Sequence, residues 1–148
     1  MYYSCLYYKL TRKTTEFDYI IAEVGKYYFE YNKKFPKSTK MSHFDKEIVN
    51  MLQIHAESSN LPFKYINEVP IDPHKILYVD LLVNDKVIVE IDGPTHFHEN
   101  GKYRKGEDYF REKLIKSLGY QFIRINYSEY NQRNLHERGK LVSEILNI

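Results

Sequence analysis

The spacing of apolar side chains divides the chain into helical and extended segments. Apolar residues at helical spacing predict helices over 16–31, over a stretch that begins after Ser42, over 107–118 and over 128–148. Branched apolar runs and alternating patterns predict strands at 63–69, 79–83, 87–91 and 120–126. From residue 42 onward the predicted order is helix, three strands, helix, strand and helix.

Local signals support several of these boundaries. Ser42 is an N-cap candidate, and Asp45, three residues later, is placed to complete a capping box. Pro36 separates the first helix from the second, and Gly119 follows the third helix as a C-cap. The short connection from the third strand through a helix to the fourth predicts that these two strands run parallel.

The two central strands flank the polar tripeptide 84–86 and predict a β-hairpin. With a two-residue turn, Asp80 would pair with Val89, and Asp80 and Glu90 would point to opposite faces of the sheet. With a three-residue turn, Asp80 lies directly opposite Glu90, with their Cβ atoms roughly 4.5–5.5 Å apart. The register therefore decides whether the two carboxylates share a site.

Acidic residues in such apolar strands are unusual, because buried carboxylates are rare unless they are paired or bind a metal. In the longer-turn register Asp92 points the same way as Asp80 and Glu90, and three carboxylates on one face favour a bound cation. The alternative is that Asp80 caps or pairs with a neighbour and that Asp92 merely opens a turn. The combination with Gly93 and His96 favours a site.

Composition restricts the class of protein. A length of 148 residues, 43% hydrophobic and 16% aromatic, predicts one globular domain. Cys5 is the only cysteine, which excludes an intramolecular disulfide and fits a reducing compartment. No apolar run has transmembrane length and the N-terminus lacks a signal-peptide pattern, so we expect an intracellular protein, cytoplasmic or organellar, that is not secreted and has no membrane partner.

Charge adds a nucleic-acid hypothesis. The net charge is only +2, but basic residues cluster in 33–40 and again in 102–105, where Tyr103 lies among them. Basic side chains interleaved with aromatic ones suit a phosphate backbone and stacked bases. For either cluster alone, a solvated surface in a chain with 15 tyrosines is about as good an interpretation.

The order of elements, with Asp80 in the second core strand and Glu90 in the third, resembles the PD-(D/E)XK nuclease superfamily. More closely, VDLLV…VIVEIDGPTHF…R…L…GY…IRI is similar to a RAP domain, the RNA-binding module related to the very-short-patch repair endonucleases. The resemblance covers residues 42–130. It implies an α/β fold with a restriction-endonuclease-like αβββαβ core, a four-stranded mixed sheet flanked by helices, preceded by an N-terminal helix.

The resemblance also implies site residues. Asp80 and Glu90 match the metal-binding acids of the superfamily, and Glu47 matches the accessory helix carboxylate of some members. Asp92 stands where the superfamily has a lysine. The repair-endonuclease branch also lacks that lysine and relies on histidine, for which His96 is the candidate.

Such a site would hold Mg²⁺ or Mn²⁺ on Asp80, Glu90 and Asp92, with His96 transferring a proton. The expected contacts with nucleic acid are His98, Lys102, Tyr103, Arg104, Lys105 and Arg111.

These observations together predict a metal-dependent endoribonuclease with an N-terminal helical extension in residues 1–40 and a RAP or PD-(D/E)XK-like domain in 41–148. Its partner would be RNA rather than DNA, and the N-terminal helix offers a surface for a homodimer or a protein partner. The first alternative is a non-catalytic RNA-binding RAP module. The second is a DNA endonuclease of the very-short-patch repair type.

Overall fold

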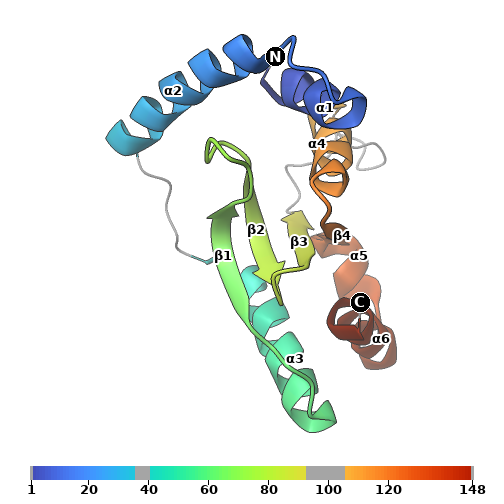
Figure 1. Cartoon of the computed structure of the whole chain (residues 1–148). Coiled ribbons are helices and arrows are strands. Elements are labelled where there is room, and N and C mark those ends of the chain that lie inside the picture. The colour runs from blue at the N-terminus through green and yellow to red at the C-terminus, as the bar shows by residue number, and fades with distance from the viewer. Residues whose placement is uncertain (1, 36–40, 93–105, 148) are drawn as a thin grey trace.

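The computed structural model of the protein describes residues 2–35, 41–92 and 106–147 (Figure 1). The helices are α1 (Tyr2–Arg12), α2 (Asp18–Lys34), α3 (His43–Ser59), α4 (Gly106–Ser117), α5 (Tyr127–Gln132) and α6 (Leu135–Asn147). The strands are β1 (Tyr65–Pro70), β2 (Tyr78–Val83), β3 (Val87–Asp92) and β4 (Gln121–Asn126).

The four strands form one mixed sheet in the order β1-β2-β3-β4. The pairs β1–β2 and β2–β3 are antiparallel, whereas β3 and β4 are parallel. Strand β3 lies inside the sheet and is buried along its whole length, as its continuous apolar run predicts. The mixed four-stranded sheet flanked by helices, with helical residues before it, confirms the predicted fold class.

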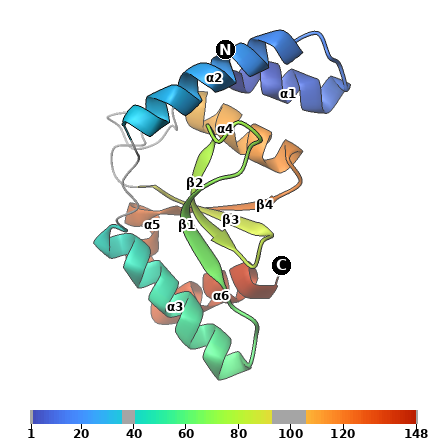
Figure 2. The same cartoon turned by 60° about the vertical axis from the view of Figure 1, so that its left-hand side comes forward.

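Helices cover both faces of the sheet (Figure 2). Helices α3 and α6 and Tyr130 of α5 pack against one face, where the buried strand residues include Leu81, Val89 and Ile125. Helices α1, α2 and α4 pack against the other face, where Leu82 and Ile88 are buried. The alternation of side chains along β2 and β3 sends neighbouring residues into these two separate cores.

Helix α3 begins as the sequence predicts. The Ser42 side chain accepts a hydrogen bond from the Asp45 backbone N–H at 3.1 Å, and the Asp45 carboxylate accepts one from the Ser42 backbone N–H at 2.8 Å. This reciprocal capping box satisfies two of the N–H groups that a helix start leaves without partners. At the other end, Asn60 closes the helix with a φ of 52°, a conformation that asparagine tolerates well.

The N-terminal part differs from the prediction, because it contains two helices rather than one. Helix α1 is anchored by Tyr2, whose hydroxyl donates a hydrogen bond of 2.6 Å to the buried carboxylate of Asp72 in the β1–β2 connection. Side chains of α1 and α2, among them Leu6 and Ile21, share a core with the sheet and α4. The predicted boundary at residue 40 falls between α2 and α3, and both N-terminal helices are part of the packed layers.

The C-terminal segment, predicted only as helical, consists of α5 and the longer α6, separated by a short break at 133–134. Among the described residues, no helix is long and apolar enough to cross a membrane.

Candidate functional site

The β2–β3 hairpin has the longer of the two turns that the sequence allowed. Val83 pairs with Val87 and Leu81 with Val89, which leaves residues 84–86 as the turn. Asn84 and Asp85 adopt positive φ values of 50° and 58°, which these two residue types accept more readily than most others. The predicted three-residue turn is therefore confirmed. The pairing of Asp80 with Glu90, one residue beyond Leu81 and Val89, stays a prediction.

Glu90 extends from the middle of the sheet toward α4 and is only 6% exposed. Its Oε1 accepts hydrogen bonds from Arg111, at 2.9 Å from Nη2 and 3.3 Å from Nε. The same Nη2 also donates to the backbone carbonyl of Tyr78 on β2. Arg111 therefore ties α4 to two strands, because its guanidinium binds both Glu90 on β3 and the Tyr78 carbonyl on β2.

The Glu90 carboxyl is nevertheless poorly stabilised as an anion. The pKa of Glu90 is raised from 4.5 to about 7; burial is the main cause, Arg111 lowers the pKa, and the negative charge of Asp80 raises it. The loss of hydration outweighs the attraction of one guanidinium. A carboxyl group with this pKa changes its charge near neutral pH.

Asp92 is paired with a second arginine. Its carboxylate is 1% exposed, and both oxygens lie close to Nη1 of Arg124, at 2.9 and 2.8 Å. Arg124 belongs to β4, where it is the register partner of Glu90, and its guanidinium lies 5.2 Å from the centre of the Phe122 ring. The parallel pairing of β3 and β4 thus brings a cation beside the two acids of β3.

Asp80 completes the cluster from β2. Its Oδ2 accepts a hydrogen bond of 2.7 Å from the backbone N–H of Ile91. Burial raises the pKa of Asp80; the hydrogen bond from Ile91 and the charge of Arg111 lower it, whereas Asp45 and Asp92 raise it. Asp80, Glu90, Asp92, Arg111 and Arg124 form what we call the acid–arginine cluster.

Helix α1 lies against this cluster. The half-buried Tyr3 donates a hydrogen bond of 3.5 Å to the carbonyl of Ile76. Burial raises the pKa of Tyr3, and the nearby Arg111 lowers it while Glu90 raises it. Tyr3 was not among the residues that the sequence singled out, because α1 itself was not predicted.

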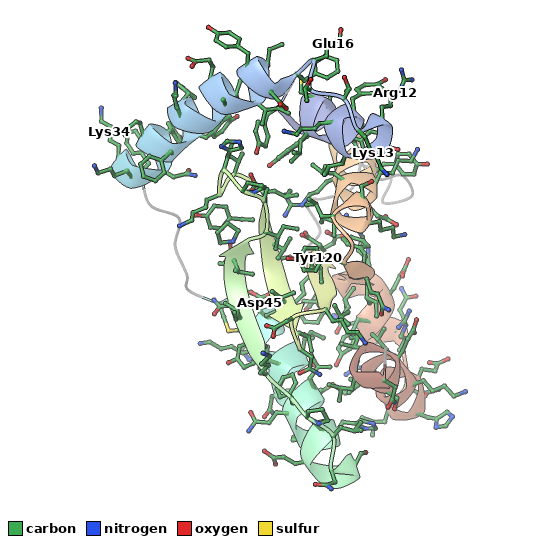
Figure 3. All side chains as sticks on the ribbon, in the orientation of Figure 1. Arg12, Lys13, Glu16, Lys34, Asp45 and Tyr120 are labelled. Carbon is green, nitrogen blue, oxygen red and sulfur yellow. The ribbon has the colours of Figure 1, made fainter. Side chains whose placement is uncertain are left out.

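The accessory acid predicted at Glu47 occupies a different place. Its carboxylate lies 3.7 Å from Nη1 of Arg138 on α6, on the opposite side of the sheet from α4. Of the carboxylates on α3, the one whose charge raises the pKa of Asp80 is Asp45, at the start of the helix (Figure 3).

Several predicted site residues lie outside the described residues. These are His96, His98, Lys102, Tyr103, Arg104 and Lys105. Their predicted roles in proton transfer and nucleic-acid binding stay predictions.

The acid–arginine cluster does not have the form of a metal site. Among the described residues, no group of three or more histidine, cysteine, aspartate or glutamate side chains is placed to hold a metal ion. Oε1 of Glu90 and both carboxylate oxygens of Asp92 instead contact guanidinium groups of the same chain. The pairing of these acids with arginines was not predicted: Arg111 was expected to contact nucleic acid, and Arg124 was recognised only as part of a strand.

A comparison with protein-family models matches the RAP domain to residues 89–144. The matched segment begins within β3 and ends within α6, so it contains Glu90, Asp92, Arg111 and Arg124 and starts after Asp80. Four of the five members of the cluster therefore lie inside the match. Over residues 89–144, which include both arginine–carboxylate pairs, the chain is similar to the RAP domain.

Proposed function

We propose that the protein binds RNA through its RAP domain and that the acid–arginine cluster holds the binding fold together. The observation that carries this proposal is the family match over residues 89–144, together with the pairing of both β3 acids with arginines of the same domain. Because arginines of the same chain offset the negative charges of Glu90 and Asp92, these two acids need no bound metal ion for charge balance. This arrangement supports the interpretation as a binding module over the interpretation as a nuclease.

The cluster also gives Glu90 and Asp92 a structural role that requires no catalysis. Arg111 connects α4 to β2 and β3, and Arg124 connects β4 to the end of β3. For the more deeply enclosed Arg124–Asp92 pair, removing the arginine leaves a buried charge without compensation, at a cost of about 3–5 kcal/mol. The cluster can therefore set the position of α4 relative to the sheet.

Helix α4 offers a surface for RNA next to the cluster. Tyr109 is exposed, and Nζ of Lys113 lies 4.7 Å from the centre of its ring. An exposed aromatic ring with a neighbouring cation can stack on a base and contact a phosphate. This pair follows directly after the basic segment 102–105, which the sequence predicts to contact nucleic acid.

Fluorescence anisotropy with labelled single-stranded RNA, duplex RNA and single-stranded DNA, over a series of salt concentrations, tests the proposal. In the variant Lys102→Ala/Arg104→Ala/Lys105→Ala, we expect weaker RNA binding and a flatter dependence of log affinity on log salt, by about 0.7 for each phosphate that the variant no longer binds. The matched control, Lys13→Ala/Lys46→Ala/Lys140→Ala, removes the same charge from exposed lysines elsewhere in the chain. A wild-type protein without measurable RNA affinity at low salt would refute the proposal.

Cleavage of RNA is the second candidate, and one observation favours it. Asp80 on β2 and Glu90 on the adjacent strand β3 are close enough for the charge of Asp80 to raise the pKa of Glu90, and both have raised pKa values, which is common at functional sites. Cleavage would require the acids to leave their arginines. The same labelled RNAs, incubated with Mg²⁺, Mn²⁺ or EDTA and separated on a denaturing gel, test for cleavage, and labelled duplex DNA tests the DNA endonuclease alternative.

A further inference from the structure

The second half of α2 has an unusual surface. From residue 26 to residue 35, every exposed side chain is aromatic or charged, and none is aliphatic. The exposed set is Lys26, Tyr27, Tyr28, Phe29, Glu30, Tyr31, Lys33, Lys34 and Phe35. Exposed fractions reach 66% for Tyr27, 54% for Phe29, 49% for Tyr31 and 55% for Phe35. Isolated exposed aromatics are ordinary, but a continuous patch on a helix indicates a binding surface.

The packing of α2 fixes this surface toward solvent. Ile21 and Gly25 are buried on its inner side, and a Cβ atom at Gly25 would lie 2.5 Å from Nδ1 of His74. Further along, Nδ2 of Asn32 donates a hydrogen bond of 3.4 Å to the carbonyl of Lys75. The β1–β2 connection thus packs against the inner side of α2. Figure 3 shows Lys34 at the end of α2 that lies away from α1.

Three of the aromatic residues form a ladder along the helix at intervals of four residues. The rings of Tyr27 and Tyr31 are nearly parallel, with planes 22° and centres 6.4 Å apart. The rings of Tyr31 and Phe35 follow with centres 5.1 Å apart, and Nζ of Lys34 lies 5.6 Å from the centre of the Phe35 ring. We call Tyr27, Tyr31 and Phe35 the aromatic ladder.

An open hollow of about 660 Å³ adjoins the ladder. Its lining consists of the ladder together with Glu30, Lys33 and Lys34. A ligand in this hollow would meet aromatic rings and two ammonium groups, against a single carboxylate.

We propose that the aromatic ladder and the lysines Lys33 and Lys34 bind single-stranded RNA, with bases stacked on the rings and phosphates at the lysines. This proposal rests on the proposed RNA-binding function and adds a second contact surface outside the RAP match. Stacking on aromatic rings accepts any base, because every base has a π-face, and neighbouring lysines supply the backbone contact.

Charge and composition favour RNA over a protein occupant. The exposed surface from 26 to 35 carries three lysines and one glutamate, so it is complementary to a polyanion. Basic side chains interleaved with aromatic rings also suit a phosphate backbone and stacked bases. The aliphatic residues of α2, such as Ile21 and Val24, face the protein's own core.

The variant Tyr27→Leu/Tyr31→Leu/Phe35→Leu tests the ladder, since leucine keeps apolar surface and helix propensity but has no ring. We expect its affinity for labelled oligo(U) and oligo(A), measured by fluorescence anisotropy, to fall roughly tenfold for each base that loses its stacking partner. Affinity for duplex RNA, whose bases are already stacked, should be unchanged. The matched control is Tyr19→Leu, an exposed tyrosine on the same helix outside the ladder.

A second variant keeps the test decisive if the triple variant does not fold. Lys33→Gln/Lys34→Gln leaves every ring in place, and we expect it to flatten the salt dependence of oligo(U) binding by about 0.7 for each phosphate released from these lysines. Ultraviolet cross-linking of oligo(U) to the wild type, followed by mass spectrometry, should place adducts on Tyr27 or Tyr31.

The outcomes separate the two proposals. Wild-type RNA binding that neither variant weakens would overturn the ladder proposal and leave the RAP-domain function standing, whereas absence of RNA binding by the wild type would overturn both. Sedimentation of the wild type as a dimer that the leucine variant dissociates, with RNA affinity unchanged, would overturn the ladder proposal as well and assign these rings to self-association.

Discussion

Glu90 and Asp92 carry carboxylates into a part of the molecule that water hardly reaches, and each meets one arginine there. The two pairs are not equivalent. Arg111 comes from α4 and is partly exposed, whereas Arg124 comes from the neighbouring strand and is more deeply enclosed. Substitutions at the two acids or the two arginines should therefore have different consequences.

The stability of the protein should depend on pH through Glu90. Its pKa is higher in the folded state than its ordinary value, so the folded state holds this proton more tightly than the unfolded state does. The resulting stabilisation is complete below about pH 4.5 and is lost as the pH rises through about 7, a change of roughly 3 kcal/mol. In Glu90→Gln this part of the pH dependence should disappear, and at pH 8 in EDTA the variant should melt at a higher temperature than the wild type.

Urea unfolding between pH 4 and 8, compared between wild type and variant, measures the effect. The control is Glu144→Gln, which removes one negative charge from an exposed position on α6. A Glu90→Gln protein that melts below the wild type at pH 8 would show that the ion pair with Arg111 outweighs the cost of burying the charge.

Removing Arg124 should destabilise the protein, whereas Glu90→Gln should stabilise it at pH 8. In Arg124→Met the apolar stem still covers Phe122, but the Asp92 carboxylate loses the guanidinium 2.8 Å away. We expect a loss of about 3–5 kcal/mol in the free energy of unfolding, because a buried charge is left without this partner. The double variant Asp92→Asn/Arg124→Met should recover part of the loss, and Arg12→Met, at an exposed position, should change stability by less than about 0.5 kcal/mol.

At the scale of elements, Asp72 holds the N-terminal helix and a loop in place together. Its Oδ1 accepts hydrogen bonds from the backbone N–H groups of Ile76 and Leu77, at 2.7 and 2.6 Å, while its Oδ2 accepts the one from Tyr2. Burial and the hydrogen bond to Asp72 raise the pKa of the Tyr2 hydroxyl, which therefore stays a donor. One carboxylate thus shapes the β1–β2 connection and anchors α1.

Tyr2→Phe should loosen α1 without disturbing the sheet. The ring still fills its place in the core, but the hydrogen bond to a charged acceptor is lost, at about 1.5–3 kcal/mol. Hydrogen exchange should accelerate at the backbone amides of α1 and stay unchanged in β3. The control Tyr19→Phe removes a hydroxyl from an exposed side chain, and equal exchange rates in both variants and the wild type would contradict the anchoring role.

The sheet could be predicted because its signals are local. The apolar runs around 84–86 indicated the hairpin, the shared-site argument favoured the three-residue turn, and Ser42 with Asp45 indicated the start of α3. In each case a few neighbouring residues carry the information, since turn and cap chemistry act over three or four positions.

The arginine pairs and α1 could not be predicted in the same way. Arg124 reaches Asp92 across 32 positions in the chain, and only the parallel β3–β4 register makes them neighbours. Helix α1 has tyrosines at 2, 3, 7 and 8, so the ring-bearing positions do not separate an inner from an outer face as clearly as aliphatic residues would. Its position depends on long-range partners such as Asp72.

At the scale of the whole molecule, the RAP match covers one edge of a sheet that the rest of the chain completes. Strands β1 and β2 pair with the matched segment through β3, and helices α1, α2 and α3 cover its two faces. The residues outside the match are therefore structural partners of the domain as well as the carriers of the aromatic ladder.

Thermal melting with Mg²⁺ or Mn²⁺ tests the whole cluster at once. A ligand that binds only the folded state raises the melting temperature by mass action. Because guanidinium groups occupy the acids, we expect millimolar metal to leave the melting temperature of wild type and Glu90→Gln equally unchanged. An upward shift in the wild type that Glu90→Gln abolishes would restore the metal-dependent nuclease as the leading hypothesis.

The anchoring of α1 has a consequence for the order of folding. Helix α1 is synthesised before the residues that it packs against. Tyr2 binds Asp72, 70 positions later, and the centre of the Tyr7 ring lies 5.4 Å from that of Phe110, which follows more than 100 positions later. Contacts of such long sequence separation form slowly, because a large loop must close before they contribute. During translation the ring of Tyr7 therefore lacks its native contact with Phe110 until α4 has been synthesised.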